Sequence, residues 1–428
     1  MSFLILFVFL GAAALAMPIA HAILLAALAA SVNNDRVPFD LLVQQMVAQV
    51  QSFPLIAIPF FMLTGSLMMG GKLGQAIVGT LTALVGRWHG GPAQVSVLSS
   101  TLFGGVSGSA VADASAIGSL IMPWHRRIGY PMAFSAASLA SAATIDIIIP
   151  PSIPMILYAL VANESIAALF FAGFLPGLML CGGFMGACWW VGKRDNLPRE
   201  TGVTDRAEFR RNLIKSFPAI ALPVLIVVFL RFGIATPTEV AVLSTLFAGL
   251  VSALIYRDIS IQRLHHAVME AGLATGIVLL VIMSSSAIGW LLTFDQMPQF
   301  VTAWVQQNVS EKWAVILLMN IMMLFLGMFI DLPAAVLLLT PVFIPLAKMI
   351  GMDTVQLGIM MVVNLAIGLY TPPVGTTLFI TSSLARVKVG ETVRAMGPFY
   401  LVALVVLGLV SYVPAVILKL PTVRSDRH

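Results

Sequence analysis

The 428-residue chain is too apolar to be a water-soluble domain. Hydrophobic residues make up 59% of it and charged residues 10%, whereas a soluble domain carries about 25% charged residues. The formal net charge of +5 comes from short basic patches between apolar runs, which is typical of cytoplasmic loops and not of a nucleic-acid-binding surface. We therefore expect an all-α polytopic membrane protein whose exterior is largely covered by the lipid bilayer.

The first part of the chain predicts a series of apolar helices. They are expected at 2–31, 54–70, 74–86, 130–148 and 166–192. The run 2–31 is interpreted as one retained spanning helix, because no basic residue precedes Arg36 as a signal peptide would require. Residues 38–53 carry apolar side chains at helical spacing from Phe39 to Val50. This indicates a helix lying along the membrane surface, with a polar loop as the alternative.

Two stretches, 92–123 and 312–347, are apolar but broken by Gly, Pro and Asp. Each predicts a helical hairpin that enters the membrane and turns back. Residues 193–216 hold seven Lys or Arg against four acids, which predicts a cytoplasmic loop. Further helices are expected at 216–232, 238–256, 273–294, 355–370 and 395–418. The total is then roughly ten full spans and two re-entrant hairpins.

These elements divide the chain into six segments. They are N-terminal scaffold helices with the surface helix (1–90), a first unit of hairpin, broken helix and following helix (91–192), a cytoplasmic loop (193–215), further scaffold helices (216–311), a second unit (312–420) and a short tail (421–428). The two units resemble each other at a constant offset of 222 residues. The matching positions are Pro123 with Pro345, Gly129 with Gly351, Pro150–Pro151 with Pro372–Pro373, and Pro176 with Pro398.

The basic residues occupy opposite ends of the two units. In the first unit His125, Arg126 and Arg127 follow the hairpin, whereas in the second unit Arg386 and Lys388 follow the proline pair. Because basic loops stay in the cytoplasm, the two units are expected to insert in opposite orientations. An inverted repeat of this kind is common among secondary transporters.

The proline pairs predict a break in one helix of each unit. Proline removes a backbone donor and clashes with the preceding turn, and a broken backbone within a membrane is tolerated where it is buried in protein or lines a wet cavity. The freed carbonyls are suitable ligands for a hard cation such as sodium, and helix N-termini facing the same cavity attract an anion. Matching breaks in both units therefore predict a paired cation and anion site near the middle of the membrane.

Acids and small polar residues surround these breaks. Asp113 and Asp146 lie in the first unit, and Asp331 falls at the offset position of Ser109. An acid in such apolar surroundings is costly and usually has a function, although an acid at a hairpin mouth could simply face water. Hydroxyls and glycine accompany the prolines at Ser152, Thr371, Gly375, Thr376 and Thr377. The alternative is that these hydroxyls only cap loose backbone at a proline kink.

Four phrases carry a resemblance to a known family. They are "FGGVSGSAVADASAIG", "IIIPPSIPMILY", "GMFIDLPAAVLLLTP" and "MVVNLAIGLYTPPVG", and they resemble the large membrane subunit of tripartite ATP-independent periplasmic (TRAP) transporters. The resemblance implies a sodium-coupled importer of a small organic anion, a carboxylate or an acidic sugar, in the bacterial inner membrane. It implies two partners, a small four-helix membrane subunit and a periplasmic substrate-binding protein. It further implies an elevator mechanism, with sodium as the coupling ion and no other cofactor.

The resemblance also nominates site residues. Sodium is expected at Gly104, Ser107, Ser109 and Pro150 in one half, and at Gly327, Asp331, Thr371 and Gly375 in the other. The substrate is expected near Ser109, Ser152, Thr376 and Thr377. One departure is Asp146, which stands where the family pattern leads us to expect a small residue. Asp113 and Asp146 are therefore possible functional acids without an assigned role.

Two other functions fit parts of the sequence. A stand-alone, cation-coupled anion carrier of the same elevator class would need no binding protein. An intramembrane serine protease is the remote alternative, because residues 105–108 read "GVSG" and would make Ser107 a nucleophile. Such a serine needs a base within hydrogen-bond reach, and His21 is the only histidine in a predicted span. The sequence contains neither a P-loop nor a His/Cys cluster, which argues against ATP-driven pumping and zinc chemistry.

Overall fold

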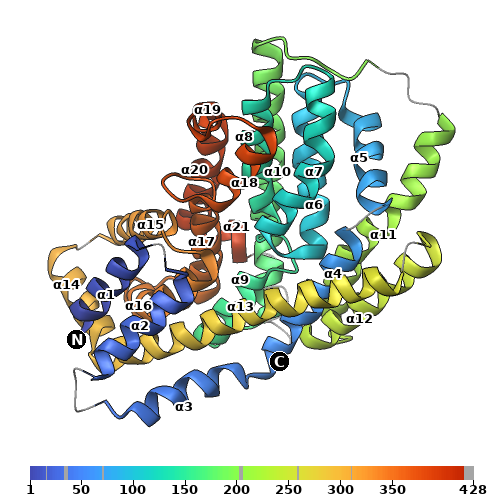
Figure 1. Cartoon of the computed structure of the whole chain (residues 1–428). Helices are drawn as coiled ribbons and strands as arrows, with labels where there is room; N and C mark the ends of the chain where they lie inside the picture. The colour runs from blue at the N-terminus through green and yellow to red at the C-terminus, as the bar shows by residue number, and fades with distance from the viewer. Residues whose placement is uncertain are drawn as a thin grey trace.

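The computed structural model describes residues 1–15, 17–32, 37–69, 72–201, 206–257, 260–309 and 311–418, and in these ranges it contains helices and no strands (Figure 1). Five of the described helices are long and apolar enough to cross a membrane, or up to seven if each of two bent helix pairs is one span. Eight further apolar helices are shorter. The all-α polytopic class is therefore confirmed, and turns within the predicted runs explain why many of the helices are short.

The first half forms helices close to the predicted runs. They are α1 (Ser2–Ala14), α2 (Ile19–Val32), α3 (Phe39–Val50), α4 (Ala57–Met69), α5 (Lys72–Val85), α6 (Gly91–Ser107), α7 (Ala110–Arg127), α8 (Met132–Ala142), α9 (Ile153–Ala162) and α10 (Ile166–Arg194), with 3-10 turns η1 (Phe53–Ile56) and η2 (Ala143–Ile145). The prediction of one spanning helix over 2–31 is wrong, because α1 and α2 are separate and pack against each other. The cause is Pro18, which disfavours helical backbone at Met17 and whose carbonyl begins α2 by accepting from the N–H groups of His21 and Ala22.

The second half begins within the stretch predicted as a loop. Its helices are α11 (Arg206–Arg231), α12 (Pro237–Leu250), α13 (Ile261–Phe294), α14 (Met297–Asn308), α15 (Lys312–Gly327), α16 (Leu332–Met349), α17 (Thr354–Gly368), α18 (Thr376–Ala385), α19 (Val389–Ala395), α20 (Gly397–Tyr412) and α21 (Ala415–Leu418), with a π-helical turn η3 (Val251–Ile255). The two ends of the 193–215 segment are thus helical, and its cytoplasmic location stays a prediction. The 34-residue α13 crosses the lower part of Figure 1 and contacts α2, α3, α4 and α16.

Both predicted hairpins are present as pairs of helices joined by a tight turn. The first joins α6 to α7 at Gly108 and Ser109, and the second joins α15 to α16 through residues 328–331. Glycine favours the first turn because Gly108 has a φ of +63°, which side chains with a Cβ rarely adopt. The hairpin tips are therefore irregular backbone at the ends of four helices.

Both predicted breaks are present as well. The first separates η2 from α9 over residues 146–152, and the second separates α17 from α18 over residues 369–375. The bonds Pro150–Pro151 and Pro372–Pro373 are both cis. The two broken helices pack against each other, α8 with α18 and α9 with α17. The breaks of the two halves are thus brought together in one place.

Opposite ends of the two halves also meet. Arg126, which follows the first hairpin, donates from its guanidinium to the carbonyl of Ala385, which precedes the second basic cluster (3.4 Å). At the other end, Thr354, which follows the second hairpin, donates to the carboxylate of Glu164, which follows the first break. The end that follows the hairpin in one half therefore lies beside the end that follows the break in the other half.

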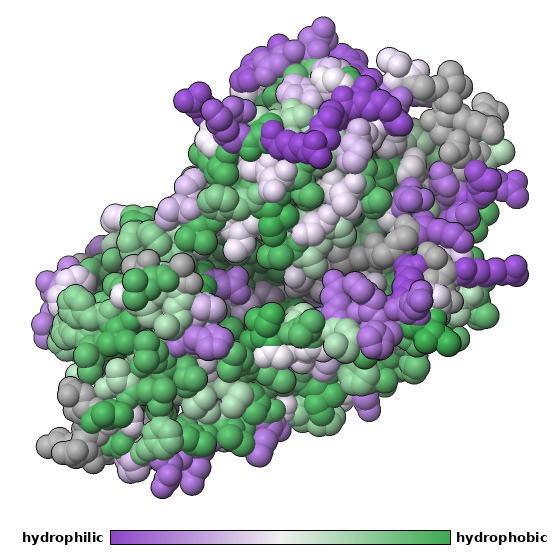
Figure 2. Space-filling model, viewed as in Figure 1, coloured by the Kyte–Doolittle hydropathy of each residue, from purple (hydrophilic) through white to green (hydrophobic). Residues whose placement is uncertain are grey.

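Apolar side chains cover much of the exterior. Figure 2 shows hydrophobic residues over much of the visible face, with hydrophilic residues gathered toward its upper, right and lower edges. Exposed large side chains include Phe3, Phe7, Leu246, Leu254, Leu273 and Leu401. An apolar exterior of this extent is expected of a protein surrounded by lipid. The predicted surface helix forms as α3, which buries Leu42 and leaves Phe39 54% exposed, while its place on the membrane surface stays a prediction.

Candidate functional site

The tip of the first hairpin is held by the carboxylate of Asp146, the first residue of the first break. Ser107 donates its hydroxyl to Oδ2 of Asp146 (2.9 Å), and the backbone N–H groups of Gly108 and Ser109 donate to Oδ1 and Oδ2 (both 2.9 Å). An ionised carboxylate only accepts hydrogen bonds, and a carboxylate with several such donors is strongly bound. Asp146, which stands where the family pattern predicts a small residue, therefore binds the hairpin tip to the break.

Two glycines allow this close approach. A Cβ on Gly104 would lie 2.8 Å from Cα of Asp146, and a Cβ on Gly108 would lie 2.8 Å from the carbonyl oxygen of Pro151. Both distances are shorter than ordinary van der Waals contact, so a larger residue would push the tip away from the break. The structure therefore brings Gly104, Ser107 and Ser109 against the segment that contains Pro150.

Ser109 and Ser152 begin the two helices that start in this region. Ser109 is the N-cap of α7, and its side chain accepts from the N–H of Ala112, while Ser152 is the N-cap of α9 and accepts from the N–H of Met155. The Ser152 hydroxyl also donates to the carbonyl of Ile147, which the break has freed from helical bonding. These hydroxyls satisfy backbone groups at helix ends, which is the usual use of a serine N-cap.

The second hairpin meets the second break with different chemistry. The N–H of Val374 donates to the carbonyl of Met328 at the hairpin tip (3.3 Å). A Cβ on Gly368 would lie 2.4 Å from the carbonyl oxygen of Gly327, so two glycines make this contact. Asp331 is the N-cap of α16, but its side chain makes no capping hydrogen bond. The carboxylate at the second tip therefore does not cap its helix in the way that Ser109 and Ser152 cap theirs.

The tip of each half has one nearby acid, but this acid lies on a different element in each half. At the offset of 222 residues, Gly368 corresponds to Asp146 and Asp331 corresponds to Ser109. The first half thus carries its acid on the broken helix, and the second half carries it on the hairpin. The positions of the two acids can be read from the sequence. That they occupy opposite sides of the same kind of contact is seen only in the structure, where each hairpin tip meets its break.

The threonines of the second break have different roles. Thr371 donates to the carbonyl of Ile367 (2.6 Å), and Thr377 lies within hydrogen-bond distance of the carbonyls of Leu369 (2.9 Å) and Ala140 (3.2 Å). The buried hydroxyl of Thr376, by contrast, has no hydrogen-bond partner within the described residues. Thr377 therefore ties the second break to α8 of the first half, while the Thr376 hydroxyl at the start of α18 makes no such bond within the described residues.

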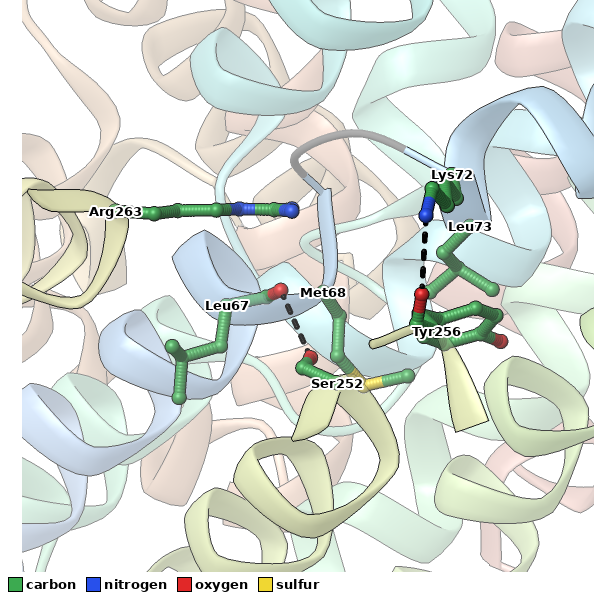
Figure 3. Close-up of a pocket in the computed structure, with 7 residues that line it drawn as sticks. All are labelled: Leu67, Met68, Lys72, Leu73, Ser252, Tyr256 and Arg263. Atoms are coloured by element: carbon green, nitrogen blue, oxygen red, sulfur yellow. Dashed lines mark hydrogen bonds between the residues drawn. The ribbon is translucent and has the colours of Figure 1, made fainter. Parts of the chain in front are cut away.

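Two hollows lie outside this region. One lies at the ends of α4, η3 and α13, where Lys72 donates to the carbonyl of Tyr256 (3.2 Å) and Ser252 to that of Leu67 (3.3 Å) (Figure 3). The other, of about 270 Å³, lies between α3 and α13 on one side and α9 and α16 on the other. Neither is lined by a predicted site residue. The first has polar contacts that satisfy helix ends, and the second separates two groups of helices.

The chain is similar over nearly its whole length to one family of proteins. The family model that matches residues 3–416 is described as "Tripartite ATP-independent periplasmic transporter, DctM component". The protein y4mL of Sinorhizobium fredii is 50% identical over 98% of this chain and 100% of its own. The large permease protein of a 2,3-diketo-L-gulonate TRAP transporter from Escherichia coli is 36% identical over 96% of each chain. That of a C4-dicarboxylate TRAP transporter from Pseudomonas aeruginosa is 37% identical over 87% of each.

A solved structure shares the fold at low sequence identity. The YdaH transporter of Alcanivorax borkumensis superposes with a TM-score of 0.59 and 14% identity, covering 86% of both chains. At this identity the likeness concerns the fold alone, because one fold serves many functions. The likeness therefore adds to the all-α assignment and not to the assignment of the site.

Proposed function

The chain belongs to the family of large permease subunits of TRAP transporters, and we propose that it imports a small organic acid together with sodium ions. It is a multi-pass membrane transporter and not an enzyme. The remote alternative of a serine protease also lacks chemical support, because the Ser107 hydroxyl donates to Asp146 and not to a histidine base. The observation that supports the proposal best is that each hairpin tip contacts the break of its own half, and that the two broken helices pack against each other. A shared site for ions and substrate requires this arrangement.

The substrate carboxylate binds at the start of α18. Thr376 supplies a buried hydroxyl without a partner in the described residues. It stands at the N-terminus of α18, which carries a partial positive charge, although one of the first N–H groups there, that of Thr377, already donates to the carbonyl of Leu369 (3.0 Å). The N–H groups of Gly108 and Ser109 at the first hairpin tip, in contrast, are bound to Asp146. The start of α18 is therefore a better place for an organic anion than the first hairpin tip.

Sodium binds at the second hairpin tip. Asp331 offers a carboxylate that caps no backbone group, and the irregular backbone of residues 328–330 and 369–375 offers carbonyl oxygens. Hard cations take oxygen ligands of these kinds. The first-half set of Gly104, Ser107, Ser109 and Pro150 stays a proposal as well, although there Asp146 takes the donors of the tip.

The two units form one transport unit that moves against a scaffold. Residues 91–192 and 312–420 make up the transport unit, and the helices of 1–90 and 216–311 make up the scaffold. Support for an inverted repeat comes from the ends of the two halves, since Arg126 contacts Ala385 and Thr354 contacts Glu164. If both basic clusters face the cytoplasm, the halves point in opposite directions. A unit of two such halves can expose one site to either side of the inner membrane in turn.

Uptake by purified components tests the proposal. The chain is reconstituted in liposomes with a small four-helix membrane subunit and a periplasmic substrate-binding protein from the same organism, and radiolabelled succinate and 2,3-diketo-L-gulonate serve as probes. We expect uptake of an organic acid when sodium is higher outside, and none when potassium replaces it. Identifying the ligand that the binding protein retains on purification selects the probe.

Two results would contradict this proposal. Uptake that is equally fast in potassium and in sodium would remove sodium as the coupling ion. Uptake by this chain alone, without the binding protein, would favour the stand-alone carrier. Liposomes with the binding protein omitted are therefore the control for the partners, and liposomes without this chain are the control for leakage.

A further inference from the structure

The cavity between the proposed scaffold and the proposed transport unit has no role in the site described above. Its volume is about 270 Å³, and it lies between α3 and α13 on one side and α9 and α16 on the other. Small-molecule sites are clefts of roughly 300–1,000 Å³ that are lined by apolar side chains and a few polar groups. The cavity is therefore close to the lower end of the range in which proteins bind small molecules.

One face of α13 forms the first wall of the cavity. Its lining residues recur at helical spacing and include Ile282, Ser285, Ser286, Gly289 and Thr293. Ser286 donates to the carbonyl of Gln45 on α3 (3.1 Å), which joins the two helices of this wall. Ser285 is only 1% exposed, and its hydroxyl has no hydrogen-bond partner within the described residues. The wall therefore combines small residues, which leave space, with a buried hydroxyl that can bind a ligand.

Two amides of α3 complete this wall. Gln45 and Gln49 both line the cavity, and because they are one turn apart they share a face of the helix. The other face of α3 carries Phe39, Val43 and Val47, which are 54%, 41% and 39% exposed. The helix therefore presents amides to the cavity and apolar side chains to the exterior, where lipid is expected.

The opposite wall is apolar but contains a backbone acceptor. It consists of Leu160 and Val161 at the end of α9 and of Leu337 and Pro341 on α16. Pro341 lies inside α16 and has no N–H to donate to the carbonyl of Leu337, one turn earlier. This carbonyl therefore lacks its regular helical donor at a place where α16 lines the cavity.

The charge of the lining determines which ligand suits the cavity. Among the described residues that line it, none carries a formal charge. Asp295, two residues after Thr293, accepts from the backbone N–H and the hydroxyl of Ser2 (2.9 and 2.5 Å). This lining offers neither a cation for an organic anion nor a carboxylate for a cation. Hydroxyl and amide groups both donate and accept hydrogen bonds, so they match an uncharged ligand whose own hydroxyls do both.

We propose that the cavity binds an uncharged polyol head group on an apolar chain, the chemistry of a monoacylglycerol. The hydroxyls of the head group bond to Gln45, Gln49 and Ser285 and donate to the carbonyl of Leu337. The chain follows the apolar wall toward the lipid beside α3. Because the walls belong to both parts of the proposed elevator, the bound molecule holds α13 against α9 and α16 and slows transport. Binding is independent of the proposed function, whereas the effect on transport rests on it.

Photolabelling of the full-length chain in phosphatidylcholine nanodiscs tests the binding without any transport. The probe is a monoacylglycerol with a diazirine on its acyl chain near the ester, and mass spectrometry locates the label. We expect saturable labelling within 282–293 or 45–49 that unlabelled monoolein prevents. Labelling that does not saturate, or that lies elsewhere, would overturn the proposal.

Three competitors test the chemistry of the ligand. Methyl oleate lacks the hydroxyls, phosphatidylglycerol is anionic, and free glycerol lacks the chain. We expect each to compete less well than monoolein at the same concentration. Equal competition by methyl oleate would remove the polyol from the proposal, equal competition by phosphatidylglycerol would contradict an uncharged ligand, and equal competition by glycerol would overturn the lipid as the source.

Variants that fill the cavity or remove its hydroxyl locate the site. Gly289→Leu should abolish saturable labelling, and the fold should tolerate it because a built Cβ there meets only Cγ of Pro341, at 3.9 Å. Gly276→Leu, at an exposed position of the same helix with nothing within 4 Å of its built Cβ, is the matched control and should label as the wild type does. Ser285→Ala should weaken labelling about fivefold, the effect of one neutral hydrogen bond. If Gly289→Leu labels as the control does, the probe binds elsewhere and the proposal fails.

Uptake by the complete complex in liposomes tests the effect on transport. Monoolein should slow uptake by the wild type and should have less effect on the double variant Gln45→Leu and Gln49→Leu. Equal inhibition of both proteins would contradict the effect on transport. If no uptake occurs even without monoolein, the proposed function fails while the labelling result still stands.

Discussion

The two hairpin tips differ in which element carries the nearby carboxylate. Asp146 belongs to the first break and binds the first hairpin tip, whereas Asp331 belongs to the second hairpin tip and makes no capping bond. The first tip is therefore closed by a group of the protein itself. At the second tip we propose that sodium binds to Asp331, whereas at the first tip Asp146 makes a structural bond.

The bond at the first tip predicts the behaviour of Asp146→Asn. The amide oxygen can still accept from the donors on one side, but its NH₂ group would face an N–H of Gly108 or Ser109 and leave it unsatisfied. Losing a buried hydrogen bond to a charged group costs about 1.5–3 kcal/mol, and 1.4 kcal/mol corresponds to a tenfold change. Hydrogen exchange in the peptide that contains residues 103–110 should therefore be about tenfold faster or more. Asp195→Asn, at an exposed position, is the control, and unchanged exchange in Asp146→Asn would refute the role of the bond.

The free carboxylate at the second tip predicts the behaviour of Asp331→Asn. Removing one charged ligand should raise the sodium concentration for half-maximal uptake by about tenfold or more, equivalent to at least 1.4 kcal/mol. The measurement is uptake by the complete complex against external sodium. Glu391→Gln, at an exposed position of α19, is the matched control and should leave the curve unchanged. An Asp331→Asn curve that coincides with the wild type would remove Asp331 from the sodium site.

Glycine and proline patterns made the hairpins and breaks predictable at the scale of elements. The proline pairs and the glycines near Gly108 act on their own local backbone, so their effect can be inferred from the sequence. Pro18 acts in the same way, but the apolar run continues on both sides of it, so the composition alone does not indicate a break there. The bonds of Asp146 to the tip and of Thr377 to Ala140 could not be predicted, because they join segments that meet only after the helices pack.

The contact between the second hairpin and the second break predicts the effect of Gly368→Ala. The added Cβ would lie 2.4 Å from the carbonyl oxygen of Gly327, so the tip must move away from the break. Overpacking of this kind costs about 1–3 kcal/mol, and we expect a lower melting temperature and a loss of uptake. Gly276→Ala on α13 is the matched control, because nothing lies within 4 Å of its added Cβ. If Gly368→Ala melts and transports as the control does, the tight contact has no function.

At the scale of the whole molecule, the proposed scaffold meets the proposed transport unit at several places, one of them along α13 where it packs against α16. The cavity of about 270 Å³ between α3 and α13 on one side and α9 and α16 on the other lies on this boundary. A built Cβ of Gly289 on α13 would lie 3.9 Å from Cγ of Pro341 on α16. The Cβ of Pro341 itself lies more than 4 Å away, so cysteines at these two positions are neighbours that can form a disulfide, with Cβ atoms about 3.5–4.5 Å apart, when the two helices approach slightly.

This boundary gives a test of the elevator mechanism. In a background with Cys181→Ala and Cys188→Ala, oxidation of the double variant Gly289→Cys and Pro341→Cys should stop uptake, and reduction should restore it, because the cross-link joins the moving part to the static part. Thr64→Cys with Thr245→Cys is the matched control within the scaffold, where the two hydroxyl oxygens lie 3.0 Å apart. Oxidation of that pair should leave uptake unchanged. Undiminished uptake by a fully cross-linked Gly289–Pro341 pair would mean that α16 does not move against α13, and the site would then have to open by another motion.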